Sequence, residues 1–273
     1  MKHVSKIVSM VLALLLVISS FMTIPFAASA ANPTPDQNKD GTLPEGAVPS
    51  TETATEFSGG DGTAENPYQI KDVTEFRYFQ SKLKSDASFL SKSYILTGNI
   101  YFNVKLDYSD AETGFPIYDL LDQSTANPYS QITGTFSGTF DGDGYGIYNA
   151  FARFDGAGAL FATVTGTIKN LNLYGGYTLF RGGAEAGSLV QLLQGGTLRN
   201  CYSSVGVYSK ASATGGLVGK VTGNPTIEDC TYAGAMYVFD NDAKHQVGGI
   251  VARAESGMTI ARCANYAPIK TKY

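Results

Sequence analysis

A glycine-rich stretch containing Gly219-Lys220 is the segment of this sequence that comes nearest to a nucleotide-binding pattern. A phosphate-binding loop of that kind needs a glycine at the position held here by Thr214, and a serine or threonine at the position held by Val221. In such loops backbone amides surround the phosphates and the hydroxyl holds magnesium. Both positions differ in this chain, so the pattern argues against a nucleotide site and the glycines need another explanation.

Other catalytic and metal-binding patterns are also missing from the sequence. His245 is the single histidine after residue 30, which excludes H-E-x-x-H zinc sites, histidine-rich metal centres and most Ser-His arrangements. No G-x-S-x-G nucleophile motif occurs. The cysteines, Cys201, Cys230 and Cys263, lack the close pairs of a zinc ribbon. We therefore expect no cofactor, no metal and no enzymatic activity.

A short acidic segment, Asp141 to Gly146, places two carboxylates beside glycines, as calcium loops do. The complete loop also needs a ligand at its fifth position and a bidentate glutamate at its twelfth. Tyr145 and Ala152 stand at those two positions. The sequence therefore predicts a Gly-Asp turn between strands here.

An insertion at residues 239–246, with the sequence FDNDAKHQ, is a candidate binding site. Insertions in repeat proteins project from one face and often bind ligands. Asp240, Asp242, Lys244 and His245 could form a polar contact site there. A plain solvated loop is the alternative.

Three acidic residues, Glu228, Asp229 and Glu255, are the candidate catalytic carboxylates if the chain is a polysaccharide-cleaving enzyme. Such enzymes need two carboxylates about 5 to 9.5 Å apart, or carboxylate-bound calcium with a basic residue, on one face. The acids of this chain do not recur at one repeat position, so they do not line a groove. A polysaccharide lyase or glycosidase is therefore the alternative and not the leading hypothesis.

A repeat of near-constant length runs through the second half of the chain. Its first apolar position recurs every 28 to 33 residues, and so does its closing position. The copies read GALFATVTGTIKNL, GSLVQLLQGGTLRNC, GGLVGKVTGNPTIEDC and GGIVARAESGMTIARC, with first apolar residues Leu160, Leu189, Leu217 and Ile250 and closing residues Leu171, Cys201, Cys230 and Cys263.

This period, with short apolar-polar alternation and no helix-length amphipathic stretch inside each copy, predicts a solenoid of strands. Ile168 and Leu173 should face the interior, while Lys169, Asn170 and Asn172 should face solvent. Glycines should supply positive φ angles where each coil changes direction.

The segment Gly216-Leu217-Val218-Gly219 resembles the signature of the bacterial GLUG repeat, and the neighbouring copies resemble degenerate versions of it. One copy has Ser188 and Gln191 where the signature has glycine. The resemblance covers residues 57–273 and implies an all-β chain, a right-handed parallel β-helix on an extracellular protein. It implies no particular chemistry.

The region before the repeats, residues 57–133, is predicted to be an N-terminal cap for the repeats at 134–273. Asp72 and Glu75 form a capping-box pattern at the start of KDVTEFRYFQSKL, whose apolar residues lie at helical spacing. One short helix there would cover the open end of the core, where unpaired strand edges invite aggregation.

The repeated cysteines allow two interpretations. Adjacent coils lie about 4.8 Å apart, a separation that permits a disulfide in an exported protein. We favour the other interpretation, a ladder of small buried side chains with Leu171 one coil earlier. The tyrosines after the closing positions, Tyr202, Tyr232 and Tyr266, are expected to stack between coils, with an aromatic strip for sugar rings as the alternative.

The ends and the charge of the chain indicate export. Residues 1–30 have basic residues, an apolar run and a small-residue exit, which predicts a signal peptide cleaved between Ala30 and Ala31. Residues 31–56 read as a disordered linker rich in proline and threonine. The chain is acidic overall and has no second apolar stretch of membrane-spanning length, so we expect no nucleic-acid binding and no membrane span after cleavage.

These patterns lead to a functional hypothesis. We expect a secreted or cell-surface module without catalytic activity, which adheres to a glycan or an extracellular protein through its repeat surface. A structural spacer or stalk of a larger surface protein is a further alternative.

Overall fold

The computed structural model describes residues 43, 46–48, 50–102, 131–149, 151–154, 158–180, 182–239 and 245–272. The predicted signal peptide and its cleavage site between Ala30 and Ala31 lie outside these residues. Spatial contacts divide the chain into Met1–Asn32 and Pro33–Tyr273, and every described residue belongs to the second part. Among the described residues, no helix is long and apolar enough to cross a membrane.

The N-terminal elements of the described chain surround a single α-helix. They are β1 (Tyr68–Ile70), α2 (Val73–Ser85), the 3-10 helix η1 (Ala87–Ser91), β2 (Ser93–Leu96) and β3 (Ile100–Tyr101). Asp72 caps α2, since its side chain accepts hydrogen bonds from the backbone N–H groups of Thr74 and Glu75. The Glu75 side chain accepts a hydrogen bond from the backbone N–H of Lys71, one residue before the N-cap residue. The predicted helix and its Asp72 N-cap are therefore confirmed, and the capping box differs in that Glu75 binds this N–H instead of the one of Asp72.

The rest of the described chain forms parallel strands that build five sheets. Sheet A contains β1, β2, β5 (Thr139–Asp141), β9 (Thr167–Lys169), β14 (Thr197–Arg199), β19 (Thr226–Glu228) and β24 (Thr259–Ala261). Sheet B contains β3, β6 (Gly146–Tyr148), β10 (Asn172–Tyr174), β15 (Tyr202–Ser203), β20 (Thr231–Tyr232) and β25 (Ala264–Asn265).

The other three sheets are built from the remaining strands. Sheet C contains β4 (Ile132–Phe136), β8 (Phe161–Val164), β13 (Val190–Gln194), β18 (Val218–Thr222) and β23 (Val251–Ala254). Sheet D contains β7 (Phe151–Phe154), β11 (Tyr177–Phe180), β16 (Gly206–Ser209), β21 (Met236–Phe239) and β26 (Ile269–Lys272). Sheet E contains β12 (Glu185–Ala186), β17 (Ala213–Gly215) and β22 (Gln246–Gly248).

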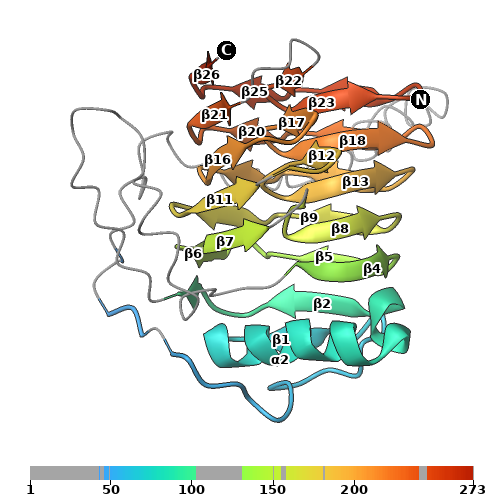
Figure 1. The fold of residues 1–273 in the computed structure, drawn as a ribbon. Helices are drawn as coiled ribbons and strands as arrows, with labels where there is room; N and C mark the ends of the chain where they lie inside the picture. Colours follow the sequence, from blue (N-terminus) through green and yellow to red (C-terminus); the bar gives the residue numbers. More distant parts are fainter. Residues whose placement is uncertain are drawn as a thin grey trace, which may run out of the picture. The chain divides into compact units, whose positions relative to one another are not determined.

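The chain visits the sheets in a fixed order and returns to the first, so each circuit is one coil of a parallel β-solenoid (Figure 1). The last three circuits run through sheets E, C, A, B and D. Five strands in sheet C correspond to five coils of the described chain. The fold class predicted from the repeat spacing, a β-solenoid with one short helix near its N-terminal side, is confirmed. The predicted boundary at residue 134 stays a prediction, and sheet A extends past it through β1 and β2.

The core consists of columns of apolar side chains in register from coil to coil. In sheet A, Ile168, Leu198 and Ile227 are direct partners and are fully buried. Asn172 was expected to face solvent but is buried, because its side-chain amide donates a 2.9 Å hydrogen bond to the carbonyl of Gly144 in the coil before. The hydrogen bond satisfies the buried amide.

The corner between sheets A and B depends on residues other than glycine. Asn170, Asn200, Asp229 and Arg262 all have φ angles between 51° and 54° at this corner. Asparagine and aspartate tolerate this left-handed conformation better than other residues with a Cβ atom. The expectation of glycine at each change of direction is therefore wrong at this corner. It holds at the turn between sheets C and A, where Gly195 and Gly223 have positive φ.

The glycines of the 215–219 stretch serve a different purpose, which is close packing of backbone. Neither Gly216 nor Gly219 has a positive φ angle. A Cβ atom on Gly216 would overlap the carbonyl oxygen of Gly249 and the ring of Tyr232. A Cβ atom on Gly219 would lie 2.8 Å from the nitrogen of Ala186. Glycine is required here because neighbouring coils approach too closely for a side chain.

Candidate functional site

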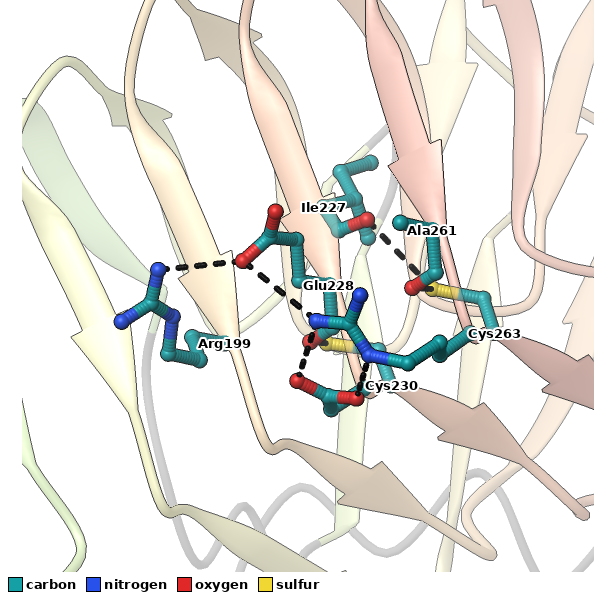
Figure 2. Close-up of polar contacts among 8 residues, drawn as sticks. Arg199, Ile227, Glu228, Cys230, Ala261 and Cys263 are labelled. Atoms are coloured by element: carbon teal, nitrogen blue, oxygen red, sulfur yellow. Dashed lines mark hydrogen bonds and ion pairs between the residues drawn. The ribbon is translucent and has the colours of Figure 1, made fainter. Parts of the chain in front are cut away.

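The outer side of the A/B corner holds a group of four charged side chains joined by ion pairs (Figure 2). We call Arg199, Glu228, Asp229 and Arg262 the corner network. Arg199 on β14 lies 3.0 Å from Glu228 on β19, which is its register partner in the next coil. Arg262 donates two hydrogen bonds to Asp229, of 2.6 and 2.9 Å, and also lies 3.7 Å from Glu228. The network thus joins three successive coils by ion pairs.

The electrostatics of the corner network oppose general acid catalysis. The hydrogen bond from Arg262 holds the pKa of Asp229 below its ordinary value, and Asp229 in turn raises the pKa of Arg262. A general acid in a glycosidase needs the opposite shift, a carboxyl pKa raised toward neutrality. Asp229 is therefore suited to hold coils together and to present charge, and is unsuited to deliver a proton.

The third acid of interest, Glu255, lies beyond β23 of sheet C and belongs to a separate ion-pair group. Its carboxylate lies 2.8 Å from Lys220 and 2.7 Å from Arg253. The hydrogen bond from Lys220 is the largest cause that lowers the pKa of Glu255. Lys220 also lies 3.7 Å from Glu185. The three acids considered as catalytic candidates thus belong to two separate ion-pair groups, Glu228 and Asp229 to the corner network and Glu255 to the group at the end of β23.

The backbone of the glycine-lysine stretch at residues 215–220 is hydrogen-bonded to the neighbouring coil. The backbone N–H groups of Gly216, Leu217 and Val218 donate to carbonyls of the next coil, at Gly248 and Ile250. Amides that hold a neighbouring coil are not available to surround phosphates. The stretch packs against the next coil, which agrees with the expectation that it is no nucleotide site.

A column of thiols lies on the inner side of the same corner. Each of the three cysteines, Cys201, Cys230 and Cys263, stands directly before a strand of sheet B. Those strands are paired in register, so the cysteines lie in one column, and Leu171 occupies the same column one coil earlier. All three thiols are free, and Cys201 and Cys230 are buried. Each donates a weak hydrogen bond to a carbonyl of its own coil, such as Cys230 to Glu228 at 3.1 Å. The favoured interpretation, a ladder of small side chains, agrees with this arrangement.

Two thiols of the column, those of Cys230 and Cys263, have little nucleophilic character. The hydrogen-bonded neighbour Cys201 is the first cause that raises the pKa of Cys230, and burial adds to the effect. The Cys230 thiol likewise raises the pKa of Cys263. A cysteine reacts as its thiolate, and a raised pKa keeps it protonated. Among the described residues, no group of three or more potential metal ligands comes together.

The other candidates from the sequence are placed as follows. Asp240, Asp242 and Lys244 lie outside the described residues. His245 is described, and its Nδ1 atom lies 2.8 Å from the carbonyl oxygen of Ala211 on the previous coil. The four residues therefore stay a predicted contact site, with one member tied to the solenoid.

The acidic turn at Asp141 is a structural turn in the described chain. Its carboxylate accepts from the N–H of Asp143 and from the side chain of Asn170, both at 2.9 Å, and it pairs with Lys169 at 2.9 Å. These protein partners occupy the oxygens that a cation would need. The preference for a turn over a calcium loop agrees with these contacts.

The tyrosines do not form one column, which corrects both interpretations of them. The register pairs Tyr202 with Thr231 and Tyr232 with Asn265, so the two rings lie in different columns. Tyr202 and Tyr232 are fully buried, while Tyr266 is 63% exposed. Tyr202 packs against Tyr174 of the previous coil, with ring centroids 5.6 Å apart. Buried rings cannot form an aromatic strip for sugar.

Comparison with known proteins identifies the repeat. A family model described as "The GLUG motif" matches residues 210–234. The chain contains a GLUG motif. That motif covers β17 to β20, and therefore most of one coil, and it includes Glu228, Asp229 and Cys230 of the A/B corner. The resemblance read from the residues is confirmed.

Two further similarities accompany the GLUG motif. Halomucin of Haloquadratum walsbyi is 27% identical over 179 residues, which is 64% of this chain and 2% of halomucin. The chain therefore spans about 2% of the length of this curated relative. A crystal structure of a "putative immunoglobulin A1 protease" from Bacteroides ovatus aligns with 79% of this chain and 70% of its own, at 19% identity and a TM-score of 0.47.

The corner network was not predicted from the sequence, although a signal was present. Arg199 and Glu228 have opposite charge at the same repeat position, one coil apart, and so do Asp229 and Arg262. In a parallel solenoid, equal repeat positions are neighbours in space. Comparing charge at equal positions of successive GLUG-like copies would therefore have found the ion pairs.

Proposed function

We propose that this chain is an exported, non-catalytic module that presents its β-solenoid at the cell surface and binds a glycan or an extracellular protein. The GLUG motif, the similarity to halomucin and the predicted signal peptide support an extracellular setting. A repetitive outer surface is a common basis for binding in solenoid proteins.

The absence of catalytic activity is proposed because outward-facing acids are paired with basic side chains. Asp229 and Glu255 each have an arginine or lysine within hydrogen-bond distance and a lowered pKa. A β-helical lyase or glycosidase would need a carboxyl with raised pKa or a carboxylate pair open to a metal. Asp229 and Glu255 have no raised pKa, and neither belongs to a group of three or more potential metal ligands among the described residues.

The test measures binding and cleavage in the same sample. The purified chain is incubated with a panel of acidic and neutral polysaccharides, and both the retained protein and newly formed chain ends are measured. Retention without new ends supports the module and identifies the class of ligand. New ends that increase with time would overturn the proposal in favour of the enzyme alternative.

The insertion is tested with a substitution that leaves β21 and β22 intact. In one variant Asp240, Asp242 and Lys244 are replaced by alanine, and in the control the exposed Glu65 and Lys84 are replaced. We expect the first variant to lose retention and the control to keep it. Equal retention by both would exclude the insertion as the contact site and leave the outer faces of the coils.

A further inference from the structure

The cysteine column at the A/B corner has a spacing that suits a disulfide between neighbouring coils. Cys201, Cys230 and Cys263 stand at one repeat position, and the strands that follow them are register partners. Register partners on neighbouring parallel strands lie about 4.8 Å apart, and disulfides join cysteines whose Cα atoms are roughly 4.4 to 6.8 Å apart. Cys230 therefore has one potential partner in the coil before it and another in the coil after it.

The third pair of cysteines, Cys201 with Cys263, is too far apart to bond. These residues are separated by two coil steps, which place their Cα atoms about 9.6 Å apart. Cysteines whose Cα atoms are more than ~7 Å apart cannot be bridged unless the backbone moves. The column therefore allows Cys230 to bond to either neighbour, excludes a bond between the two neighbours, and leaves one of the three thiols reduced.

The three side chains point into the same part of the core. Cys201 and Cys230 belong to the main core cluster, and Cys263 packs against it. The Cys230 thiol is hydrogen-bonded to the thiols of both neighbours, and Figure 2 shows it with Cys263 of the next coil. Because the thiols are in direct contact, no other side chain stands between the sulfur atoms that a disulfide would join.

The hydrogen bonds of the thiols can be lost without cost to their acceptors. The Cys230 thiol donates to the carbonyl of Glu228 at 3.1 Å, and this carbonyl also accepts from the backbone N–H of Asn200 at 2.9 Å. The carbonyls that accept from the other two thiols likewise have a backbone N–H donor. A disulfide has no S–H group, and its formation therefore leaves no buried carbonyl unsatisfied.

We infer that Cys230 forms a disulfide with one of its two neighbours in the column when the chain folds in an oxidising environment. The inference rests on the extracellular setting of the proposed function, because disulfides form and persist in exported proteins. The small buried thiols and the disulfide are two redox states of one column, and the structure describes the reduced state. The bond fixes the GLUG coil to a neighbouring coil on the inner side of the corner network, and salt, which screens exposed ion pairs, does not weaken it.

The electrons pass to a small disulfide, such as oxidised glutathione. A Cys230 thiolate attacks one sulfur of the small disulfide and expels a thiolate, which leaves a mixed disulfide on the protein. A neighbouring cysteine thiolate then attacks the Cys230 sulfur and expels the second small thiolate. Two protein thiols are thus oxidised to one disulfide, the small disulfide is reduced to two thiols, and the two protons pass from the cysteines to the expelled thiolates.

The reaction belongs to the folding of the chain, before the column closes. Cys201 and Cys230 are buried in the folded chain. The Cys201 thiol, with burial, raises the pKa of Cys230, so few reactive thiolates exist there. The disulfide should therefore form during folding and should afterwards be protected from exchange.

The experiment refolds the purified chain from urea in a buffer of oxidised and reduced glutathione. Free thiols are then labelled with iodoacetamide in denaturant, and disulfide-linked peptides are mapped by mass spectrometry. The wild type should contain one intramolecular disulfide and one free thiol, with Cys230 in every linked pair of peptides. Cys201→Ala and Cys263→Ala should each still form one disulfide, whereas Cys230→Ala should form none, because its remaining cysteines are two coils apart.

The effect on stability is measured by thermal unfolding with and without dithiothreitol. The oxidised wild type should unfold at a temperature roughly 5 to 15 °C higher than the reduced wild type. Cys230→Ala should show no such difference. Cys230→Val is a second variant without the thiol, and its larger side chain suits a column that holds Leu171 two coils earlier. Circular dichroism of each variant shows that the solenoid is folded.

Each other result overturns the inference. A folded wild-type chain with three free thiols shows that the column stays reduced. A peptide that links Cys201 to Cys263, or an intramolecular disulfide in Cys230→Ala, contradicts the spacing of the column. Disulfides that join two chains, seen on a non-reducing gel, show that the thiols do not pair within the column. Retention on polysaccharides is a separate measurement, so failure of the disulfide and failure of the proposed function are told apart.

Discussion

The contrast between Ile227 and Ile260 gives a direct test of the coil register and of the burial of each side chain. The two side chains are identical, they follow a threonine in each case, and they pair with each other in sheet A. Ile227 is fully buried, whereas Ile260 is 42% exposed. Replacing each by alanine therefore removes the same atoms from two environments that differ mainly in burial.

The expected losses follow from burial. Alanine lacks three carbon atoms of isoleucine, and at about 0.8 kcal/mol per buried carbon the transfer cost at Ile227 is about 2.4 kcal/mol. The cavity left in a closed core raises the loss to about 3 to 4 kcal/mol. At Ile260 the transfer cost falls to about 1.4 kcal/mol, because 42% of the side chain is already exposed, and no closed cavity forms. The two variants should differ by about 2 kcal/mol.

The assay is urea unfolding followed by far-ultraviolet circular dichroism at micromolar protein concentration. Comparing the m-values of the two variants with wild type shows whether unfolding stays cooperative across coils. Equal losses for the two variants would contradict the burial difference, because Ile260 would then be covered. A loss below about 1 kcal/mol for Ile227→Ala would refute the register that places this side chain in the core.

Three further predictions concern packing, pH and thiol reactivity. Gly216→Ala should cost about 3 kcal/mol or more in unfolding free energy, because its Cβ would overlap the next coil; Gly182→Ala, with no atom within 4 Å, should be close to neutral, and equal effects would contradict the packing argument. The folded pKa of Asp229 lies below its ordinary value of 3.8, so its stabilising contribution is present above that pH and is lost as the pH falls through the folded pKa. Acid unfolding should therefore begin at higher pH in Arg262→Gln, and an unchanged midpoint would contradict the pairing. Cys263 alone should react with iodoacetamide in the folded chain, and slowly, since its pKa is raised and the other two thiols are buried; mass spectrometry that finds label on a buried thiol would contradict the column.

The architecture was predictable because residues that stack in neighbouring coils of a solenoid recur at a constant spacing in the sequence. Leu171, Cys201, Cys230 and Cys263 recur at one repeat position, and the structure places them in one column. The residue type at the A/B corner was not predictable in full. Asparagine and aspartate tolerate the left-handed conformation, but Arg262 adopts it too, with φ 53°.

The side-chain environments were less predictable than the backbone. Tyr202 follows its closing position by one residue and Tyr232 by two, and strand alternation sends such neighbours to opposite faces. The tyrosines therefore do not occupy one repeat position, although each follows a closing residue closely. Asn172 reads as a polar surface residue, and its burial depends on a hydrogen bond to the coil before it, which periodicity does not show.

The constant register of the coils has a consequence for length. Each coil occupies about 4.8 Å along the stacking direction and uses some 30 residues. Val190 and Val218 occupy equivalent positions on paired strands, so a chain that lacked residues 190–217 would join Leu189 to Val218 and keep both neighbouring coils chemically intact. Gene duplications and deletions of one repeat would therefore change the distance between the two sides of the solenoid in equal steps. The fold is a molecular ruler whose length can vary while the residues at its ends stay the same.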